Sequence, residues 1–379
     1  MKVMFVITCM PVGGAETLLV ELIRGMDRAR FQPELCCLKY FGPLGETLAG
    51  EIPAFTGLLA HKYDFAVLGR LTRLMRRRRI EAVVTVGTGG DKMFWGRLAG
   101  WLAGVPVICS ALHSTGLPDH VEWPNRLLAP ITDAFIAVAR SHGQYLVEHE
   151  GCPARKVRVV PNGVDTERFR PRAANPALRE ELGIPPGVPL AGIVAALRPE
   201  KNHALFLAAA QRTLQRAPDA HFLIVGDGPR RGAIEAMRRQ WGLTDAVHLA
   251  GARRDIPELL ALLDVFALTS HMEANPVSIL EALACERPVV ATAVGSVPET
   301  VIEGKTGCLV EPGNAQAIAD RLVELFCDRE KAMALGRAGR QHVINHWSLD
   351  RMVSGYENLL AEIYQTKTAV AGQAASLPR

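Results

Sequence analysis

The feature that most constrains the fold is a rhythm of short apolar runs alternating with longer amphipathic segments. Short runs rich in valine, isoleucine and leucine are typical of buried strands, and the intervening segments have the spacing of one-sided helices. This alternation predicts an α/β protein with a parallel sheet covered by helices. In the first half, the expected strands are Val3–Thr8, Glu34–Leu38, Ala82–Val86, Val105–Ser110, Ala134–Ala137 and Val157–Val160, and the expected helices lie near Glu16–Met26, Phe65–Arg77, Lys92–Ala103 and Ser141–Glu150.

The same rhythm returns after a segment rich in proline and glycine, which indicates a linker. The expected strands there are Leu190–Ala195, His221–Val225, Val247–Leu249, Val265–Leu268 and Val289–Ala291, and helices are expected over Gln316–Phe326, Glu330–Asn345 and Leu349–Tyr364. The predicted organisation is a first Rossmann-like domain, a linker, a second Rossmann-like domain, a final helix and a disordered tail, over residues 1–170, 171–188, 189–346, 347–366 and 367–379.

Composition narrows the class of protein. A hydrophobic content of 49% and a charged content of 22% are those of an ordinary folded protein. The formal net charge of +4 is too small to argue for a nucleic-acid partner. No apolar stretch approaches the roughly 20 residues that cross a bilayer, and the cysteines form no Cys-x-x-Cys pair. We therefore expect a soluble or peripheral protein in a reducing, cytoplasmic setting.

The strongest chemical signal lies in the segment 269–310. Glu273 and Glu281 are separated by seven residues, and Asn275 and Pro276 between them are typical of a helix N-cap and a first helical position. The first turn of such a helix presents unpaired amides, which suit an anionic phosphate. Two carboxylates beside such amides suit the hydroxyls and diphosphate of a sugar nucleotide. The predicted phosphate-binding stretch comprises Asn275, Pro276, Val277 and Ser278.

Two glycine-rich turns follow expected strands. Gly13 and Gly14 precede an expected helix, where the backbone can approach a ligand closely and the helix start favours an anion. Gly226 and Gly228 follow a strand in the second half. Neither turn has the spacing Gly-x-Gly-x-x-Gly, which argues against a dinucleotide fingerprint. A plain tight turn is the alternative for the first of them.

These motifs continue through the stretches 287–292, 295–299 and 304–307, and together they resemble the donor-site signature of retaining glycosyltransferases of family 4. The resemblance covers nearly the whole chain and is strongest from 190 to 310. It implies the GT-B fold, in which two Rossmann-like domains face each other across a deep cleft and the final helix crosses back to the first domain. In that family the first domain is on the acceptor side and the second binds the nucleotide sugar.

The resemblance also implies roles for single residues. Glu273 would hold the hydroxyls of the hexose, and Glu281 those of the ribose. Lys201 matches the lysine that contacts the diphosphate, but Ala196 stands where the family usually has an arginine. Either Arg198 takes over from a shifted position or one phosphate contact is missing. A solvated basic turn is the alternative.

His113 directly follows an expected strand and resembles the active-site histidine of the family, although a lone histidine more often forms an ordinary structural hydrogen bond. Arg253 could contact the base or a phosphate. Gly13, Gly14, Gly226 and Gly228 match nucleotide or acceptor loops of the family. Gly87 and Gly89 end another expected strand on the same edge as His113 and could line the acceptor cleft.

The expected function is retaining transfer of a hexosyl unit from a nucleoside-diphosphate sugar to a saccharide or polyprenyl-linked saccharide acceptor. A UDP-sugar is favoured over GDP-mannose, the pathway is cell-surface or exopolysaccharide biosynthesis, and no metal or cofactor is required. Ala274 and Asn275 depart from the family's usual Gly and Phe or Leu, which leaves the sugar open. The alternatives are a sugar-nucleotide epimerase of the same fold, a Rossmann oxidoreductase and an inactive binding module.

Arginines gather at the end of one expected helix, at Arg73 and Arg76–Arg79. A solvated helix end, favoured by the helix dipole, is the simpler interpretation. The second interpretation is attraction to anionic lipid, which gains about 1 kcal/mol per basic residue near the membrane surface. The expected location is therefore the cytoplasm, with peripheral contact at the inner face of the membrane as a hypothesis.

Overall fold

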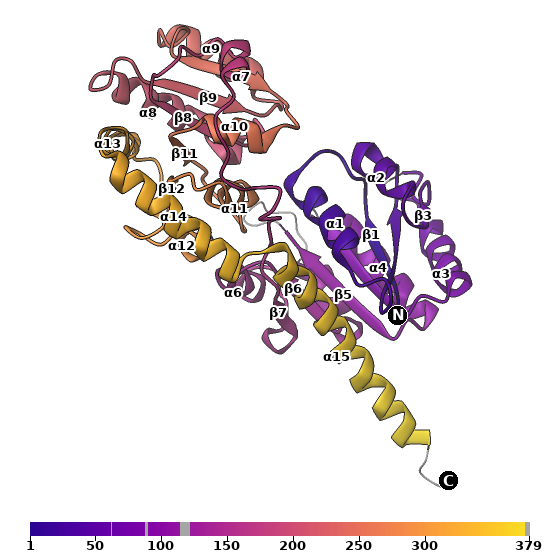
Figure 1. Cartoon of the computed structure of the whole chain (residues 1–379). Coiled ribbons are helices and arrows are strands. Elements are labelled where there is room, and N and C mark those ends of the chain that lie inside the picture. The colour runs from indigo at the N-terminus through magenta and orange to yellow at the C-terminus, as the bar shows by residue number, and fades with distance from the viewer. Residues whose placement is uncertain (62, 88–89, 114–121, 376–379) are drawn as a thin grey trace. The chain divides into compact units, whose positions relative to one another are not determined.

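A computed structural model describes residues 1–61, 63–87, 90–113 and 122–375 (Figure 1). The chain divides into two compact units, each with its own parallel sheet. Unit 1 comprises Met1–Gly163 and Leu349–Arg379, and unit 2 comprises Val164–Ser348. The predicted α/β class is therefore confirmed, and the last helix belongs to unit 1 although it follows unit 2 in the sequence.

In the described part of unit 1, seven parallel strands pair in the order β3-β2-β1-β4-β5-β6-β7. The strand order reverses direction between β1 and β4, so the turns that follow these two strands diverge at the carboxyl edge of the sheet. The inner strands β2, β1, β4, β5 and β6 are almost wholly buried, whereas the edge strands β3 and β7 are half-buried or exposed. Their bounds are Lys2–Ile7, Gln32–Cys37, Ala54–Phe55, Ala82–Gly87, Val107–Leu112, Ala134–Ala137 and Val157–Val159, for β1 to β7.

The helices of unit 1 come from both ends of the chain. They are α1 Gly14–Gly25, α2 Gly42–Ala49, α3 Ala66–Arg78, α4 Gly90–Ala103, α5 Glu122–Leu128, α6 Arg140–Glu148 and α15 Leu349–Ala375, with short 3-10 turns at Ala129–Ile131 and Ala154–Lys156. Helix α15 packs on α1 and β5. Its Glu357 carboxylate accepts a hydrogen bond from the Asp27 amide at 2.7 Å, and its Tyr364 hydroxyl donates to Glu81 at 2.9 Å.

Unit 2 has a sheet of parallel strands in the order β10-β9-β8-β11-β12-β13. One continuous core of buried side chains lies between this sheet and its helices. The strands are β8 Leu190–Val194, β9 His221–Val225, β10 Val247–Gly251, β11 Val265–Leu268, β12 Val289–Thr292 and β13 Gly307–Val310. The helices are α7 Pro176–Glu181, η3 Pro199–Lys201, α8 His203–Leu214, α9 Arg231–Gln240, α10 Ile256–Leu262, α11 Val277–Ala284, α12 Val297–Thr300, α13 Ala315–Cys327 and α14 Arg329–His346.

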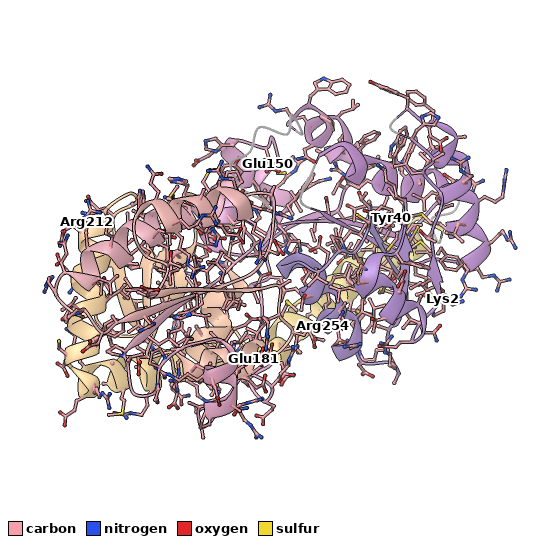
Figure 2. All side chains as sticks on the ribbon, turned by 90° about the horizontal axis from the view of Figure 1, so that it is seen from above. Lys2, Tyr40, Glu150, Glu181, Arg212 and Arg254 are labelled. Atoms are coloured by element: carbon pink, nitrogen blue, oxygen red, sulfur yellow. The ribbon has the colours of Figure 1, made fainter. Side chains whose placement is uncertain are left out.

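The structure departs from the predicted organisation at the predicted linker and at the predicted tail. The predicted linker 171–188 contains α7 and is part of unit 2, because Leu178 and Ile184 are buried in that unit's core. Figure 2 draws Glu181, at the end of α7, on the body of unit 2. The predicted tail is also wrong in part, because α15 continues to Ala375 and Lys367 bonds to Asp133. Residues 376–379 lie outside the described part of the chain.

Candidate active site

Two of the predicted site residues, Lys201 and Glu273, meet where the strand order of unit 2 reverses, between β8 and β11. At such a switch point the turns that follow two adjacent strands diverge, and α/β proteins bind ligands there. The turn after β8 carries Lys201 and the turn after β11 carries Glu273. The Lys201 ammonium donates to Oε1 of Glu273 at 2.6 Å, and the Ser270 hydroxyl donates to the same oxygen at 2.6 Å.

The surrounding structure shields this ion pair and joins the two turns that carry it. The Glu273 side chain is 7% exposed and that of Lys201 is 23% exposed, so neither group is free in solvent. The two turns are also joined through their backbones, since the amide of His271 donates to Glu200 at 2.8 Å. The Thr269 hydroxyl donates to the next two backbone carbonyls after Glu200, those of Lys201 and Asn202, at 3.2 and 3.1 Å. Sequence reasoning missed Ser270, although a polar residue directly after a buried strand is a signal for this edge.

The start of α11 differs from the prediction. The N-cap is Pro276, and the helix begins at Val277. Asn275 does not cap the helix, because its side-chain amide points inward and donates to the hydroxyls of Ser296 and Thr300 at 3.3 and 3.2 Å. Pro276 has no amide hydrogen, so the first backbone N–H groups of the helix belong to Val277 and Ser278.

Glu281 lies one turn into α11 and is half-buried. Burial raises the pKa of its carboxyl group to about 7, and the nearby Arg168 guanidinium works in the opposite direction. Near neutral pH the group therefore changes easily between a hydrogen-bond donor and the carboxylate, which only accepts. Two ribose hydroxyls would favour the carboxylate.

The two arginines predicted near the phosphates differ in their surroundings. Arg198 is exposed, and within the described residues its guanidinium forms no ion pair. Arg253 is held by two carboxylates, at 2.6 Å from Glu181 and 2.6 Å from Asp255. The hydrogen bonds that the Arg253 guanidinium donates to these carboxylates, first to Asp255 and then to Glu181, raise the pKa of Arg253 above its ordinary value. Arg198 is thus available to a phosphate, whereas Arg253 already has its charge balanced.

Gly226 and Gly228 brace the turn that carries Arg198 and Lys201. Their φ angles are 142° and 156°, and a Cβ atom on Gly226 would lie 2.0 Å from the carbonyl oxygen of Ala195. The Leu197 amide donates to the carbonyl of Asp227 at 3.0 Å. The backbone of the glycine turn after β9 therefore packs directly on the turn after β8, and only glycine permits this close approach.

The remaining predicted residues belong to unit 1. Gly13 is the N-cap of α1 and Gly14 its first residue, and the Glu16 carboxylate folds back beside Gly13. His113 follows β5 and is half-buried. Burial lowers the pKa of His113 to about 4, with His142 adding to the effect, so the imidazole is neutral at pH 7. Gly87 ends β4, whereas Gly89 lies outside the described residues.

The arginine run of unit 1 lies where α3 leads into β4, at the amino edge of the sheet. Arg76 donates to the carbonyl of Leu102 at 2.6 Å, and Arg78 pairs with the buried Glu34 at 2.8 Å. Part of the run therefore stabilises unit 1. None of the helices over the described residues is long and apolar enough to cross a membrane, and these residues contain no group of three His, Cys, Asp or Glu side chains placed to hold a metal ion.

Comparison with known proteins adds to this geometry. The sequence model of the family "Glycosyl transferases group 1" matches residues 174–342, and that of "Glycosyltransferase Family 4" matches residues 12–168. The GDP-mannose-dependent alpha-(1-6)-phosphatidylinositol monomannoside mannosyltransferase of Mycolicibacterium smegmatis is 31% identical over 315 residues, covering 80% of this chain and 74% of that protein. Its Mycobacterium tuberculosis counterpart is 34% identical, but the match covers only 56% of that protein.

A relative from Escherichia coli, UDP-Gal:alpha-D-GlcNAc-diphosphoundecaprenol alpha-1,3-galactosyltransferase, is 25% identical over 94% of this chain and 95% of its own. Among solved structures, a glycosyltransferase of Rickettsia africae has a TM-score of 0.83 at 22% identity, covering 95% of this chain and 98% of that one. HepE of Anabaena, solved with UDP and glucose, has a TM-score of 0.82 at 21% identity, covering 96% and 100%. The chain therefore belongs to the group 1, family 4 glycosyltransferases and has their GT-B fold of two Rossmann-like units.

Proposed function

We propose that the protein is a retaining glycosyltransferase that moves a hexosyl unit from a nucleoside-diphosphate sugar to an acceptor hydroxyl. The observation that carries the proposal is the Lys201–Glu273 pair at the switch point of unit 2. The pair combines a cation with a hydrogen-bond acceptor, and Glu273 precedes the first turn of α11 in the sequence. A diphosphate needs the cation and the amides, and a hexose needs the acceptor.

The chemistry follows from these groups. As the bond between the sugar's anomeric carbon and the phosphate oxygen breaks, negative charge grows on the departing diphosphate. Lys201, Arg198 and the amides of Val277 and Ser278 are proposed to stabilise that charge. Glu273 accepts hydrogen bonds from the hexose hydroxyls, and Glu281 accepts them from the ribose. An arriving phosphate would share the Lys201 ammonium with Glu273.

Retention of configuration requires the new bond to form on the face that the leaving group departs from. The acceptor oxygen attacks the anomeric carbon on that face, and its proton passes to an oxygen of the departing phosphate. This route uses no protein nucleophile, no metal ion and no cofactor. We expect full activity after treatment with EDTA, and a loss reversed by added Mg²⁺ would contradict this part of the proposal.

The proposed donor is a UDP-sugar and the proposed acceptor is a saccharide or polyprenyl-linked saccharide in cell-surface polysaccharide synthesis. Support comes from the E. coli relative, which is named for UDP-Gal and a diphosphoundecaprenol acceptor and matches 94% of this chain. GDP-mannose is the second candidate, since the M. smegmatis relative is named for it. A lipid-linked acceptor would place the enzyme at the cytoplasmic face of a membrane, in peripheral contact with anionic lipid.

A thermal-shift screen tests the donor site. The purified protein is heated with UDP, GDP, ADP, UDP-glucose, UDP-N-acetylglucosamine, GDP-mannose and NAD, beside Glu281→Ala and the exposed control Glu311→Ala. We expect one nucleotide family to stabilise the wild type and Glu311→Ala, and to lose its effect in Glu281→Ala. Stabilisation by NAD alone, or an equal shift in both variants, would contradict the proposed site.

A further inference from the structure

The turn that carries Glu273 rests on a second segment of unit 2, which overlaps the stretches of the family signature but whose individual residues have no role so far. This segment runs from the end of β12 to the end of α12, and four of its residues contact the Glu273 turn: Thr292, Gly295, Ser296 and Thr300. The Thr292 hydroxyl donates to the carbonyl of Ser270 at 2.7 Å. Ser296 and Thr300 accept from the Asn275 amide. We call these four residues the cradle.

The contact at Gly295 is the closest. Gly295 has a φ of 51°, and a Cβ atom there would lie 1.8 Å from the carbonyl oxygen of Glu273. No side chain fits in that space without moving the backbone of Glu273. The glycine thus lets the two backbones touch, which fixes the carbonyl of the residue whose carboxylate faces Lys201.

The cradle hydroxyls lie in the interior. The side chains of Thr292, Ser296 and Thr300 are fully buried, as is that of Ser270, and Asn275 is 6% exposed. Losing a hydrogen bond in such a place leaves a polar group unpaired, which is costly, so the bonds hold their geometry. Contacts at both ends of the turn and at its centre leave little freedom to the segment 270–275.

We propose that the cradle is a positioning device for the Glu273 carboxylate. This inference rests on the proposed function, because it concerns the same donor site. Thr292 fixes Ser270, the Ser270 hydroxyl fixes Oε1 of Glu273, and that oxygen receives Lys201. None of the cradle side chains is proposed to touch substrate. Small displacements of a catalytic group lower the rate strongly, so these residues act on the reaction through Glu273.

The proposal also gives Asn275 a role. Its side chain is turned inward to the cradle, so it contributes to the donor site by fixing the turn that carries Glu273. This explains why a polar residue stands where the family usually has Phe or Leu. The hexose preference would then depend on how the cradle orients Glu273.

A matched pair of variants tests the cradle. Thr292→Val keeps the shape of the side chain and removes its hydroxyl. Thr213→Val removes the same kind of bond elsewhere in unit 2, where a fully buried threonine hydroxyl donates to the carbonyl of Ala209 at 2.9 Å. Both variants are expected to lower the melting temperature. Only Thr292→Val is expected to lower kcat, by about tenfold or more, and Thr292→Ser is expected to restore it.

The kinetic parameters separate positioning from general damage. In Thr292→Val the affinity for the nucleoside diphosphate alone should stay within about twofold of the wild type, because that ligand lacks the hexose that Glu273 holds. If the wild type transfers sugar and Thr292→Val has the kcat of Thr213→Val, the cradle proposal is wrong and the proposed function stands. If the wild type neither binds nor transfers from any nucleotide sugar, the proposed function fails, and the cradle proposal falls with it.

A double-variant cycle gives a second, independent test. Gly295→Ala should lower kcat when introduced alone, and should change it less than about twofold in a Glu273→Gln background, since both changes disable the same group. Gly304→Ala is the control, because Gly304 has a φ of 69° but no atom near its Cβ position. It carries similar backbone strain without the contact to Glu273. Independent, multiplying effects of Gly295→Ala and Glu273→Gln would overturn the proposal.

Discussion

The burial of Glu281 opposes the role proposed for its carboxylate in holding a ribose. Burial raises the pKa of its carboxyl group from 4.5 to about 7, so folding disfavours the carboxylate that a ribose would need. Below pH 4.5 the group is protonated in both the folded and unfolded states, and burying it does not lower the free energy of unfolding through its charge. Above pH 7 it is ionised in both states, and the folded protein bears the full cost of a half-buried charge.

We therefore expect Glu281→Gln, which keeps the shape without the charge, to raise the free energy of unfolding at pH 8 by about 1–3 kcal/mol. The gain should shrink as the pH falls from 7 towards 4.5. The same variant should bind the nucleoside diphosphate at least about tenfold more weakly, because it loses an ionised acceptor. Urea unfolding at pH 5 and pH 8, with the exposed Glu311→Gln as control, measures this, and a gain equal at both pH values would contradict it.

For single residues, the sequence predicted candidates for the site but not the contacts between them. Glu273 and Lys201 stand 72 positions apart, so their pairing depends on the sheet order and on no local signal. The N-cap expected at Asn275 was wrong because its side chain finds buried hydroxyls of a segment that is distant in the sequence. Local propensity at a helix start does not include such tertiary partners.

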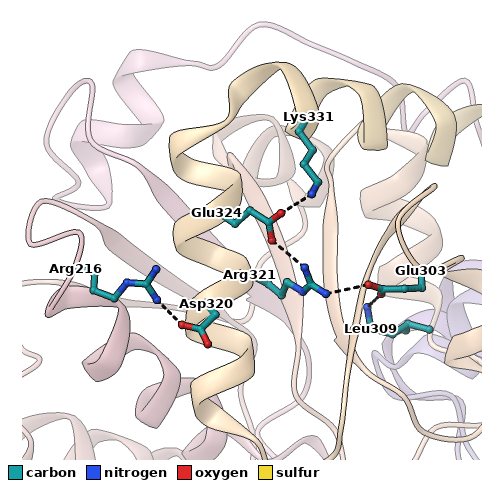
Figure 3. Close-up of polar contacts among 7 residues, drawn as sticks. All are labelled: Arg216, Glu303, Leu309, Asp320, Arg321, Glu324 and Lys331. Carbon is teal, nitrogen blue, oxygen red and sulfur yellow. Dashed lines mark hydrogen bonds and ion pairs between the residues drawn. The ribbon is translucent and has the colours of Figure 1, made fainter.

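At the scale of elements, ion pairs join α13, α14 and the turn before β13 (Figure 3). Arg321 bridges two carboxylates, at 3.1 Å from Glu303 and 3.0 Å from Glu324. Glu324 also pairs with Lys331 on α14, and Glu303 accepts from the amide of Leu309 at the edge strand. Networks of this kind hold neighbouring elements in register better than isolated pairs do.

We expect Arg321→Ala to lower the free energy of unfolding of unit 2 by about 1 kcal/mol or more, because two carboxylates lose their shared partner. The loss should diminish in high salt, which screens exposed charges. The control is Arg216→Ala, which removes a single exposed ion pair to Asp320, a residue of α13 like Arg321. This change should lower the free energy of unfolding by less than about 0.5 kcal/mol. Chemical denaturation of both variants compares them directly, and equal losses would show that the network adds nothing.

The elements that could be predicted are those with long, buried apolar runs. Strand β3 has two residues, and α2 begins with Gly42 and Pro43, so neither has a periodic pattern. Helix α15 runs beyond its predicted end because small residues with good helix propensity follow, and Lys367 is anchored to the carbonyl of Pro106 and to Asp133. Composition alone could not indicate these contacts of Lys367 within unit 1.

At the scale of the whole molecule, the end of the chain stabilises its beginning. Helix α15, yellow in Figure 1, belongs to unit 1 although unit 2 separates it from the rest of that unit in the sequence. Leu360 and Tyr356 of α15 are buried, at 0% and 3% exposure. The parallel α/β pattern predicted this class of fold, and the resemblance to family 4 predicted the return of the last helix. The division after Gly163 was not predicted, because Val164 joins unit 2 by pairing with Ser348.

We expect Leu360→Ala to lower the stability of unit 1 by about 2–5 kcal/mol, as for other buried leucines. Met333→Ala on α14, where the side chain is 53% exposed, is the control and should cost less than about 0.5 kcal/mol. Hydrogen exchange followed by mass spectrometry should show faster exchange in β1 and β5 and no change in β8 and β9. Uniform acceleration in both units would contradict the assignment of α15 to unit 1.

The central claim is that Lys201 and Glu273 form the donor site of a retaining glycosyltransferase. The most direct measurement is the rate of sugar transfer, with the anomeric configuration of the product determined by NMR, for the wild type, Lys201→Met, Glu273→Gln and the exposed control Lys305→Met. We expect a product with the donor's configuration, a loss of kcat of about 100-fold or more in each site variant, and an unchanged control. A folded Lys201→Met or Glu273→Gln protein that transfers at the wild-type rate, or an inverted product, would contradict it.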